Sequence, residues 1–392
     1  MNAFEPVCPS CGAVYGVEPL YICRQCGGSL DIRYDYEKIF RHTPFKDMAV
    51  RSGGGMWKYR ELLPVLPGIP PVTLGEGGTP LLPANRIPNI RNISSLYLKT
   101  ESVNPTLAFK DRPLSVALTA AKQFGMAEVV CASTGNTGVA ASAYAARAEM
   151  RCTVYVPAGT PPEKLAAMEQ YGAHLETVDG SFSDAYAAAG LAAERRHAFN
   201  LTSTYLNPYA AEGDKTVAYE LLAELGRVPD WITVPIGAGP LLAGIYKGFR
   251  EMKLAGYIDR LPRMAGIQAA GCAPIAEAFR AGENNVRPWS GAAKTIASGI
   301  ADPLFSYAED GTRTLSVIRE SGGTAAAIAD EELIRYRKLL AEKEGVLAEL
   351  SSVASVAVLE CLLEKAAIKP SDTVIAIVTG HGLKDMSAAI KR

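Results

Sequence analysis

The sequence predicts an α/β protein, in which short buried strands alternate with helices and form parallel sheets covered by helices on both faces. The composition is that of a packed globular chain, because 48% of its 392 residues are hydrophobic and 21% are charged. Apolar, β-rich runs recur between residues 96 and 379, and helical patterns separate them. A cluster of cysteines before residue 27 marks a small additional segment at the N-terminus.

The charge balance argues against several classes of partner. Lys plus Arg is 40 and Asp plus Glu is 41, so the net charge is −1 and gives no electrostatic reason to bind nucleic acid or an anionic membrane. No apolar run approaches the ~18–20 residues that span a bilayer, and the first 20 residues lack the pattern of a signal peptide. We therefore expect a cytoplasmic protein.

The repeating pattern predicts the individual elements. Helices are expected at Arg112–Gly125 and Asn136–Ala148, with further helices between the later strands. The predicted strands are Leu96–Glu101, Glu128–Ser133, Cys152–Val156, His174–Val178, Trp231–Ile236, Ala265–Ala269 and Thr373–Thr379. The spacing alone does not say how many sheets these strands form.

The N-terminal cysteines form two Cys-x-x-Cys-Gly turns, one from Cys8 and Cys11 and one from Cys23 and Cys26. Two such turns supply four thiolates, the ligand set of a structural zinc site. A redox pair and a ribbon that keeps its shape without metal are the competing interpretations. We predict a zinc-ribbon-like segment over residues 1–36.

Ligand sites in open α/β sheets lie outside the carboxyl ends of strands, and four segments occupy such places. The first, Asn104–Arg112, places Lys110 at the start of a helix. A helix N-terminus disfavours the ammonium form, so the pKa of Lys110 should fall and the amine become a nucleophile. A surface lysine that follows a turn is the alternative.

Two of the other three segments could bind an anion, and the third is singled out only by its position after a strand. Ser133–Gly138 brings hydroxyls and N–H groups to a helix start, which fits a carboxylate or phosphate but also a plain helix cap. Gly237–Gly244 is a glycine turn that opens a helix and could cradle phosphate, although a bare Gly-x-Gly is weak evidence. Thr379–Asp385 again follows a strand.

In combination and order, these segments resemble the tryptophan-synthase-β-like group of pyridoxal-phosphate enzymes (fold type II), and within it the threonine synthases. The motifs that carry the resemblance are Gly75–Pro80, Asn104–Arg112, Ser133–Asn136, Asn207–Thr216 and Thr379–Asp385, with Tyr34-Asp35-Tyr36 after the cysteine ribbon. The resemblance implies two open, twisted α/β domains with the cofactor in the cleft. We assign residues 37–95 and 206–392 to a large domain and 96–205 to a small one, and expect a homodimer.

The resemblance also implies roles for single residues. Lys110 carries the Schiff base with pyridoxal phosphate, Asn136 bonds its phenolic oxygen and Thr379 faces its pyridine nitrogen. The cofactor phosphate is assigned to Gly237, Ala238, Gly239, Pro240 and Leu241, the substrate carboxylate to Ser133, Thr134 and Thr137, and the remaining substrate contacts to Asn207 and Lys215.

The implied reaction converts O-phospho-L-homoserine and water into L-threonine and phosphate, with Lys110 moving the protons. The chain departs from the family pattern at Leu107-Ala108 (usually Gly-Ser), at Ala210 and Ser298–Ala301 (usually arginine-bearing), and at Pro240, which lacks an N–H donor. Losing guanidinium partners weakens the assignment of a phosphorylated substrate and leaves donors such as Ser203, Asn207 and Lys215.

Three alternatives therefore remain open. A cysteate-synthase-like enzyme acting on O-phosphoserine with sulfite, or a Ser/Thr deaminase, would use the same scaffold. From another class, the chain could be a zinc-ribbon binding protein with an inactive catalytic domain, although Lys110 and Thr379 are both present.

Overall fold

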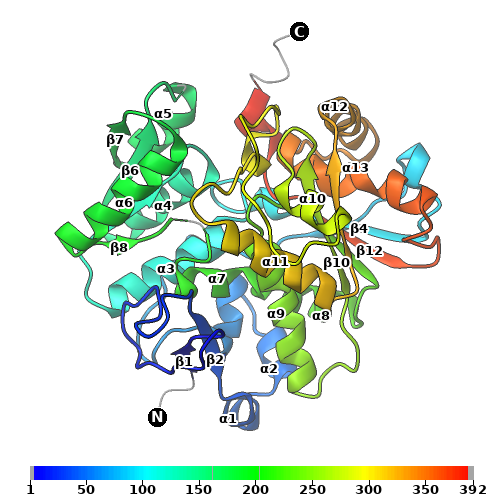
Figure 1. Ribbon diagram of the computed structural model, residues 1–392. Helices are drawn as coiled ribbons and strands as arrows, with labels where there is room; N and C mark the ends of the chain where they lie inside the picture. The colour runs from blue at the N-terminus through cyan, green and yellow to red at the C-terminus, as the bar shows by residue number, and fades with distance from the viewer. Residues whose placement is uncertain (1–3, 161, 203, 387–392) are drawn as a thin grey trace. The chain divides into compact units, whose positions relative to one another are not determined.

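The computed structural model describes residues 4–160, 162–202 and 204–386, and it confirms the predicted α/β fold (Figure 1). The chain divides into two compact units. Unit 1 comprises Met1–Gly78 and Lys110–Thr216, and unit 2 comprises Thr79–Phe109 and Val217–Arg392. Within the described residues, no helix combines the length and apolarity needed to cross a bilayer.

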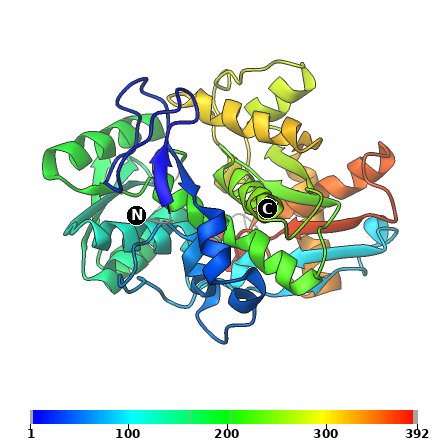
Figure 2. The same ribbon diagram turned by 90° about the horizontal axis from the view of Figure 1, so that it is seen from below.

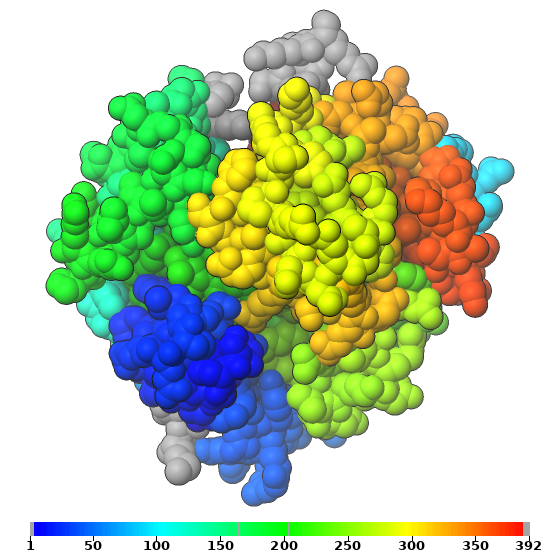
Figure 3. All heavy atoms as spheres, in the orientation of Figure 1, coloured from blue at the N-terminus to red at the C-terminus, as the bar shows by residue number. Residues whose placement is uncertain are grey.

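Unit 1 begins with the cysteine-rich segment. Its strands β1 (Phe4–Val7) and β2 (Asp31–Tyr34) pair antiparallel and enclose the two cysteine turns. The blue atoms of Figure 3 show that this N-terminal part reaches the surface. The helices α1 (Tyr36–His42), α2 (Phe45–Ala49) and η1 (Gly55–Leu62) follow, and the carboxylate of Asp35 caps α1.

The rest of unit 1 is a parallel four-stranded sheet in the order β7-β6-β5-β8. Small alanines of α6 pack on one face against Val130 and Ala132, whereas Cys152 meets Ser142 of α4 on the other. The elements are α3 (Asp111–Gln123), β5 (Glu128–Ala132), α4 (Asn136–Ala148), β6 (Arg151–Pro157), α5 (Pro162–Gln170), β7 (His174–Val178), α6 (Phe182–Arg196), β8 (Phe199–Asn200) and α7 (Pro208–Asp214). Helix α8 (Thr216–Leu225) carries the chain into unit 2.

Unit 2 contains a six-stranded sheet in the order β11-β10-β9-β12-β4-β3, parallel except for the edge strand β3. Figure 2 shows β4 (light blue) beside β12 (red), although they come from opposite ends of the chain. The strands are β3 (Leu81–Pro83), β4 (Ser95–Lys99), β9 (Trp231–Pro235), β10 (Arg263–Ala269), β11 (Thr324–Ile328) and β12 (Thr373–Ile377).

Helices cover both faces of this sheet. On one face, α12 and α13 pack through Tyr336 and Val353 against β-strand residues such as Leu98. On the other face, α9 and α11 approach so closely that a Cβ at Gly266 would lie 2.8 Å from Ile318. The helices are η2 (Pro88–Ile90), η3 (Glu101–Val103), α9 (Pro240–Leu254), α10 (Pro274–Arg280), η4 (Ser298–Ile300), α11 (Ala308–Glu320), α12 (Asp330–Leu339), η5 (Leu340–Glu344), α13 (Leu350–Glu364) and η6 (Gly382–Asp385).

The structural units differ from the predicted domain boundaries in three places. The strand predicted at Leu96–Glu101 was assigned to the small domain, but β4 lies between β12 and β3 in the sheet of unit 2. Residues 37–78 and residues 206–216, both assigned to the large domain, belong to unit 1. An apolar run predicts a strand but not its partner, and in a parallel sheet the partner lies far away in sequence, here Ile377 opposite Lys99.

Candidate functional site

The segment that leads to Lys110 is held by the loop after β12. Ala108 forms an antiparallel bridge with Gly380, the N–H of Phe109 donates to the carbonyl of Thr379 at 2.9 Å, and the N–H of His381 donates to Leu107 at 3.0 Å. Two of the four segments singled out in the sequence are therefore directly hydrogen-bonded to each other within unit 2.

Lys110 follows directly on this paired segment and begins unit 1. It is half-buried and caps α3, a helix of 13 residues that starts at Asp111, close to the predicted start. Burial raises the pKa of the Cys131 thiol in β5, and the positive charge of Lys110 opposes that rise. The lysine charge therefore lies near the carboxyl end of β5, where α/β proteins place ligands.

Thr379 is held by a hydroxyl that the sequence analysis missed. Its Oγ1 lies 2.8 Å from Oγ of Ser352, which also accepts the N–H of Gly380 at 2.7 Å. Thr379 is only 6% exposed, so the hydroxyl pair is fixed in orientation. Ser352 belongs to the apolar helix α13, where nothing in the sequence distinguishes it from a buried helix serine.

The glycine turn after β9 is closely packed from behind. Gly239 has φ +98°, and a Cβ there would lie 2.3 Å from Thr314 of α11. The hydroxyl of Thr314 donates to the carbonyl of Ala238 at 2.5 Å, and the amide of Gln268 donates to that of Gly237 at 3.2 Å. The side chains of Thr314 and Gln268, from distant elements, thus hydrogen-bond two carbonyl groups of the turn.

The same turn opens α9, a helix of 15 residues that begins at Pro240. With the carbonyls of the turn engaged by the protein, the N–H groups of the first helical turn are the groups available to an anion. Pro240 contributes none, so Leu241 is the first donor that follows it in the helix. The arrangement fits a phosphate group.

Ser133 organises the start of α4. Its Oγ accepts the N–H groups of Gly135 at 3.1 Å and Gly138 at 2.9 Å. Because the oxygen accepts twice, the hydroxyl hydrogen of Ser133 is left to donate to a further acceptor. Together with Thr134 and Thr137 at the start of a 13-residue helix, this arrangement suits a carboxylate.

The structure places Asn207 inside the fold, where it caps α7. Its Oδ1 accepts from Tyr209 and Ala210, and its Nδ2 donates to the carbonyl of Asn200 at 2.8 Å. Asn207 is 0% exposed. Ser203, the neighbouring donor named above, lies outside the described residues.

Lys215 is also buried and does not lie on the surface of a helix. Its Nζ lies 2.6 Å from Glu212 and 3.7 Å from the centroid of the Tyr34 ring. The Tyr34 hydroxyl donates to the same carboxylate at 2.8 Å. The two motifs Tyr34–Tyr36 and Asn207–Thr216 are thus joined in one buried cluster, and a substrate contact for Lys215 stays a prediction.

Helix α7 also supports the start of α3. A Cβ on Gly213 would lie 2.3 Å from the carbonyl oxygen of Arg112, so only glycine allows this approach. Arg112 is fully buried and donates to Oγ1 of Thr216 at 2.9 Å. The Asn207–Thr216 motif therefore braces the turn that carries Lys110.

The four N-terminal cysteines converge. Their Sγ atoms all lie within 4.8 Å of one another, with 3.5 Å between Cys8 and Cys26 and between Cys11 and Cys23. Four ligands at ~2.3 Å from one zinc ion lie about 3.8 Å apart, so the cluster fits a tetrahedral site. The Tyr15 hydroxyl at 3.1 Å lowers the pKa of Cys23 to about 6, whereas the pKa of Cys11 and that of Cys26 are raised.

Comparison with known proteins assigns the segments between residues 72 and 380 to one protein family. Residues 72–380 match the family model described as pyridoxal-phosphate dependent enzyme. The chain belongs to this family. Threonine synthase of Methanocaldococcus jannaschii is 41% identical over 388 residues, 98% of this chain and 94% of its own length. Threonine synthase of Methanosarcina acetivorans is 40% identical over the same share of this chain and 93% of its own length.

Solved structures confirm the predicted fold type II of the pyridoxal-phosphate dependent enzymes. Maize serine racemase aligns with a TM-score of 0.65 at 23% identity over 78% of this chain and 88% of its own. The processed threonine deaminase isoform 2 from Solanum lycopersicum aligns with a TM-score of 0.66 at 19% identity, over 80% and 86%. These likenesses concern the fold.

The residues assigned to the cofactor and to the substrate carboxylate divide between the units. Lys110, Ser133, Thr134, Asn136 and Thr137 lie in unit 1, all at helix starts, whereas Gly237–Leu241 and Thr379 lie in unit 2, after β9 and β12. Sequence reasoning missed the residues that hold them, Ser352, Gln268 and Thr314. All three come from elements far away in the chain, and a local motif carries no signal for them.

Proposed function

We propose that the chain is a threonine synthase, a pyridoxal-phosphate-dependent lyase that converts O-phospho-L-homoserine and water into L-threonine and phosphate. The observation that carries the proposal is the 41% identity to the Methanocaldococcus jannaschii enzyme, because it extends over 98% of this chain, the cysteine-rich segment included. When bound, pyridoxal phosphate takes up the electrons released as the Cα proton leaves.

The chain's own residues would hold the cofactor at both ends. Lys110 would bond to it covalently, and the N–H groups around Gly237–Leu241 would bind its phosphate. Asn136 would contact the phenolic oxygen, and Thr379 the pyridine nitrogen. The Ser352 partner supports this last role, because it fixes a neutral hydroxyl there and leaves the nitrogen without a carboxylate.

The substrate's α-carboxylate would lie at the start of α4, where Ser133, Thr134 and Thr137 supply hydroxyls. The two N–H bonds that Ser133 accepts support this role, since they leave its own O–H to donate to a further acceptor. Lys110, once released by the substrate, would move the protons at Cα and Cβ.

The distal phosphate of the substrate is the least supported contact. Ala210 and Ser298–Ala301 offer no guanidinium, and Lys215 is already paired with Glu212. These observations favour a second candidate, another β- or γ-elimination or replacement enzyme on the same scaffold, acting on O-phosphoserine or on an unphosphorylated amino acid.

One assay separates the two candidates. Phosphate and L-threonine release are measured from O-phospho-L-homoserine, with O-phosphoserine plus sulfite, and L-serine, in parallel. Threonine synthase activity predicts equal amounts of phosphate and threonine from the first substrate alone. Efficient turnover of another substrate, without threonine from O-phosphohomoserine, contradicts the proposal.

A gain of function refines this test. Ala210→Arg should lower the KM for O-phosphohomoserine roughly tenfold or more if a missing cation limits binding, since a charged hydrogen bond contributes about 1.5–3 kcal/mol. Ala211→Arg adds the same charge one position along α7 and serves as the control. Equal effects of both variants would assign the change to bulk charge.

We also propose that Cys8, Cys11, Cys23 and Cys26 bind one structural zinc ion. The converging sulfurs and the Tyr15 contact to Cys23 support this role. The expected homodimer and cytoplasmic location stay predictions.

A further inference from the structure

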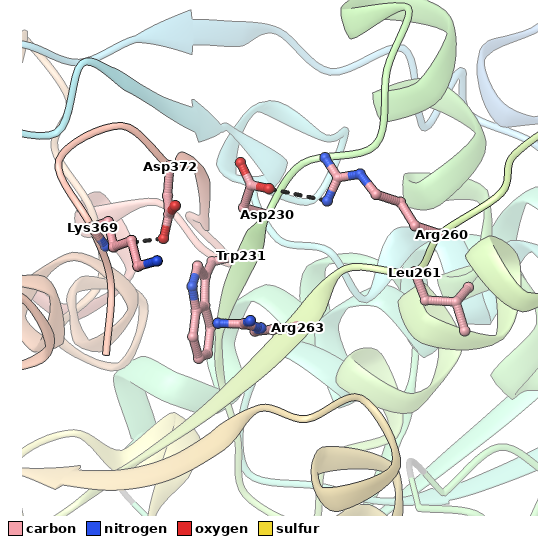
Figure 4. A pocket seen from close by; sticks show the side chains of 7 residues that line it. All are labelled: Asp230, Trp231, Arg260, Leu261, Arg263, Lys369 and Asp372. Carbon is pink, nitrogen blue, oxygen red and sulfur yellow. Dashed lines mark hydrogen bonds and ion pairs between the residues drawn. The ribbon is translucent and has the colours of Figure 1, made fainter. Parts of the chain in front are cut away.

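Unit 2 has a cavity at the end of its sheet opposite the glycine turn and Thr379. Its volume is about 220 Å³, below the ~300–1,000 Å³ of sites for drug-sized ligands. It opens at the amino ends of β9, β10 and β12, and Figure 4 shows the residues that line it: Asp230, Trp231, Arg260, Leu261, Arg263, Lys369 and Asp372.

Trp231 contributes a buried donor that has no acceptor. The side chain is 3% exposed, and within the described part of the chain its indole Nε1–H finds no hydrogen-bond partner. Such a group costs about 1–3 kcal/mol, so native proteins usually satisfy it with protein, water or ligand. The guanidinium of Arg263 lies 5.4 Å from the ring centroid.

The charged groups of the cavity also leave donors in excess. Asp230 already accepts from Arg260 at 3.0 Å and from the N–H of Thr373 at 2.8 Å. Asp372 accepts the backbone N–H of Lys369 at 2.9 Å. By contrast, no ion pair among the described residues engages the ammonium of Lys369 or the guanidinium of Arg263. The lining thus carries three cations, Arg260, Arg263 and Lys369, against two carboxylates, and the indole N–H adds one more donor.

The cavity is separate from the cofactor segments. Trp231 is the first residue of β9 and Thr373 the first of β12, whereas the glycine turn and Thr379 follow the last residues of the same strands. Five residues of β-strand span about 17 Å. A ligand bound here would not touch the atoms that react.

We propose that this cavity binds a small oxyanion, a carboxylate or a phosphate group. The anion accepts the indole N–H of Trp231 and lies between the charges of Lys369 and Arg263. The indole nitrogen is covered, so a neighbouring side chain must move to admit the anion. Lys369 is exposed and lies on the side of the nitrogen-bearing edge in Figure 4, so it is the side chain that moves.

The indole signals of the holoenzyme test this directly. The chain has three tryptophans, so protein labelled with 15N at the indole gives three Nε1–H resonances, and Trp231→Phe identifies that of Trp231. Sodium phosphate is titrated at constant ionic strength against chloride. The Trp231 resonance should shift and saturate, while that of Trp57, bonded to Glu76 and Ser115, should stay in place.

Charge variants show whether the cavity itself is the site. Lys369→Gln and Arg263→Gln should each raise the dissociation constant roughly threefold or more. Lys365→Gln removes the same charge from a nearby exposed lysine outside the cavity and should change it little. A linear, unsaturating shift, or equal behaviour of all three variants, would overturn the proposal and leave a water molecule as the partner of the indole.

A second titration distinguishes the sources of the oxyanion. Succinate and L-threonine replace phosphate in otherwise identical samples. Saturation by a carboxylate alone assigns the site to an organic acid or amino acid, and saturation by phosphate alone assigns it to phosphate. A Trp231 resonance that responds to none of the three contradicts the proposal.

Discussion

Two lysines of unit 1, Lys110 and Lys215, stand in the same relation to a helix but in opposite surroundings. Each directly precedes a helix, Lys110 before α3 and Lys215 before α8, and a helix start disfavours an ammonium group. Lys215 in addition caps the carboxyl end of α7, which favours a cation. Lys215 is fully buried, and Glu212 and the Tyr34 ring compensate its charge. Lys110 is half-buried near the carboxyl end of β5. Position before a helix therefore does not distinguish these two lysines, whereas their burial and their charged neighbours do.

The largest effect is expected at Lys110. Lys110→Ala should lower product formation at least roughly 10³-fold, because the chain then lacks both the amine that bonds the cofactor and the base that moves the protons. Steady-state phosphate release from O-phosphohomoserine measures the loss. In the unmodified enzyme, borohydride reduction and peptide mapping should place the cofactor label on Lys110. A label on Lys99 or Lys215 would contradict the assignment of the cofactor to Lys110.

Lys215→Met should act on stability. It leaves the Glu212 carboxylate buried without its cation, which typically costs about 3–5 kcal/mol. Urea unfolding measures this loss, and the double variant Lys215→Met, Glu212→Gln should recover part of it because no charge is then left unpaired. If Lys215→Met is fully stable but has a much higher KM for O-phosphohomoserine, the lysine binds substrate as the sequence predicted.

The sequence predicts candidate site residues where the pattern is local. Lys110 before a helix, the glycine turn at Gly237 and the hydroxyls from Ser133 can be found because each lies in a contiguous strand–turn–helix pattern. The parallel sheet of unit 2 was predicted in type but not in membership. β4 pairs with a strand at the far end of the chain, and side-chain periodicity carries no information about that partner.

The groups that fix the site were out of reach for the same reason. Ser352, Gln268 and Thr314 are ordinary residues in their own elements and gain a role only through neighbours brought by the fold. The burial of Lys215 belongs to the same class, because its partner Tyr34 comes from the cysteine-rich segment. Motifs predict the groups that meet ligands, and long-range packing determines the groups that support them.

Chelator treatment tests whether the cysteine-rich segment stabilises the rest of unit 1. The loop between the cysteine pairs bonds the body of unit 1 twice: Tyr21 accepts the N–H of Asn200 at 2.8 Å, and Tyr209 donates to the carbonyl of Glu18 at 2.6 Å. Losing both should cost about 1–3 kcal/mol. Chelator treatment should therefore lower the urea midpoint more than turnover.

Metal analysis of protein purified without chelator gives the reference state for this experiment. About one equivalent of zinc per chain is expected, and less than half an equivalent would favour a ribbon that keeps its shape without metal. Tyr209→Phe removes only one of the two bonds and should reproduce part of the chelator effect in the zinc-loaded protein. If the urea midpoint does not change after complete zinc removal, the cysteine-rich segment does not contribute to the stability of unit 1.

The smallest predicted effect concerns the backbone just before Lys110. Leu107 has φ +62°, a left-handed conformation that costs a non-glycine residue about 1–2 kcal/mol. Leu107→Gly should therefore raise the free energy of unfolding by up to about 1 kcal/mol, since the relief of strain exceeds the greater chain entropy of glycine. Val103→Gly, in the same segment but outside the positive-φ region, is the matched control and should destabilise by roughly 0.5–1 kcal/mol. The measurement is the urea midpoint of each variant relative to that of the parent chain. Opposite signs show that this chain retains a strained turn beside Lys110, whereas equal destabilisation would mean that the contacts of the Leu107 side chain outweigh the strain.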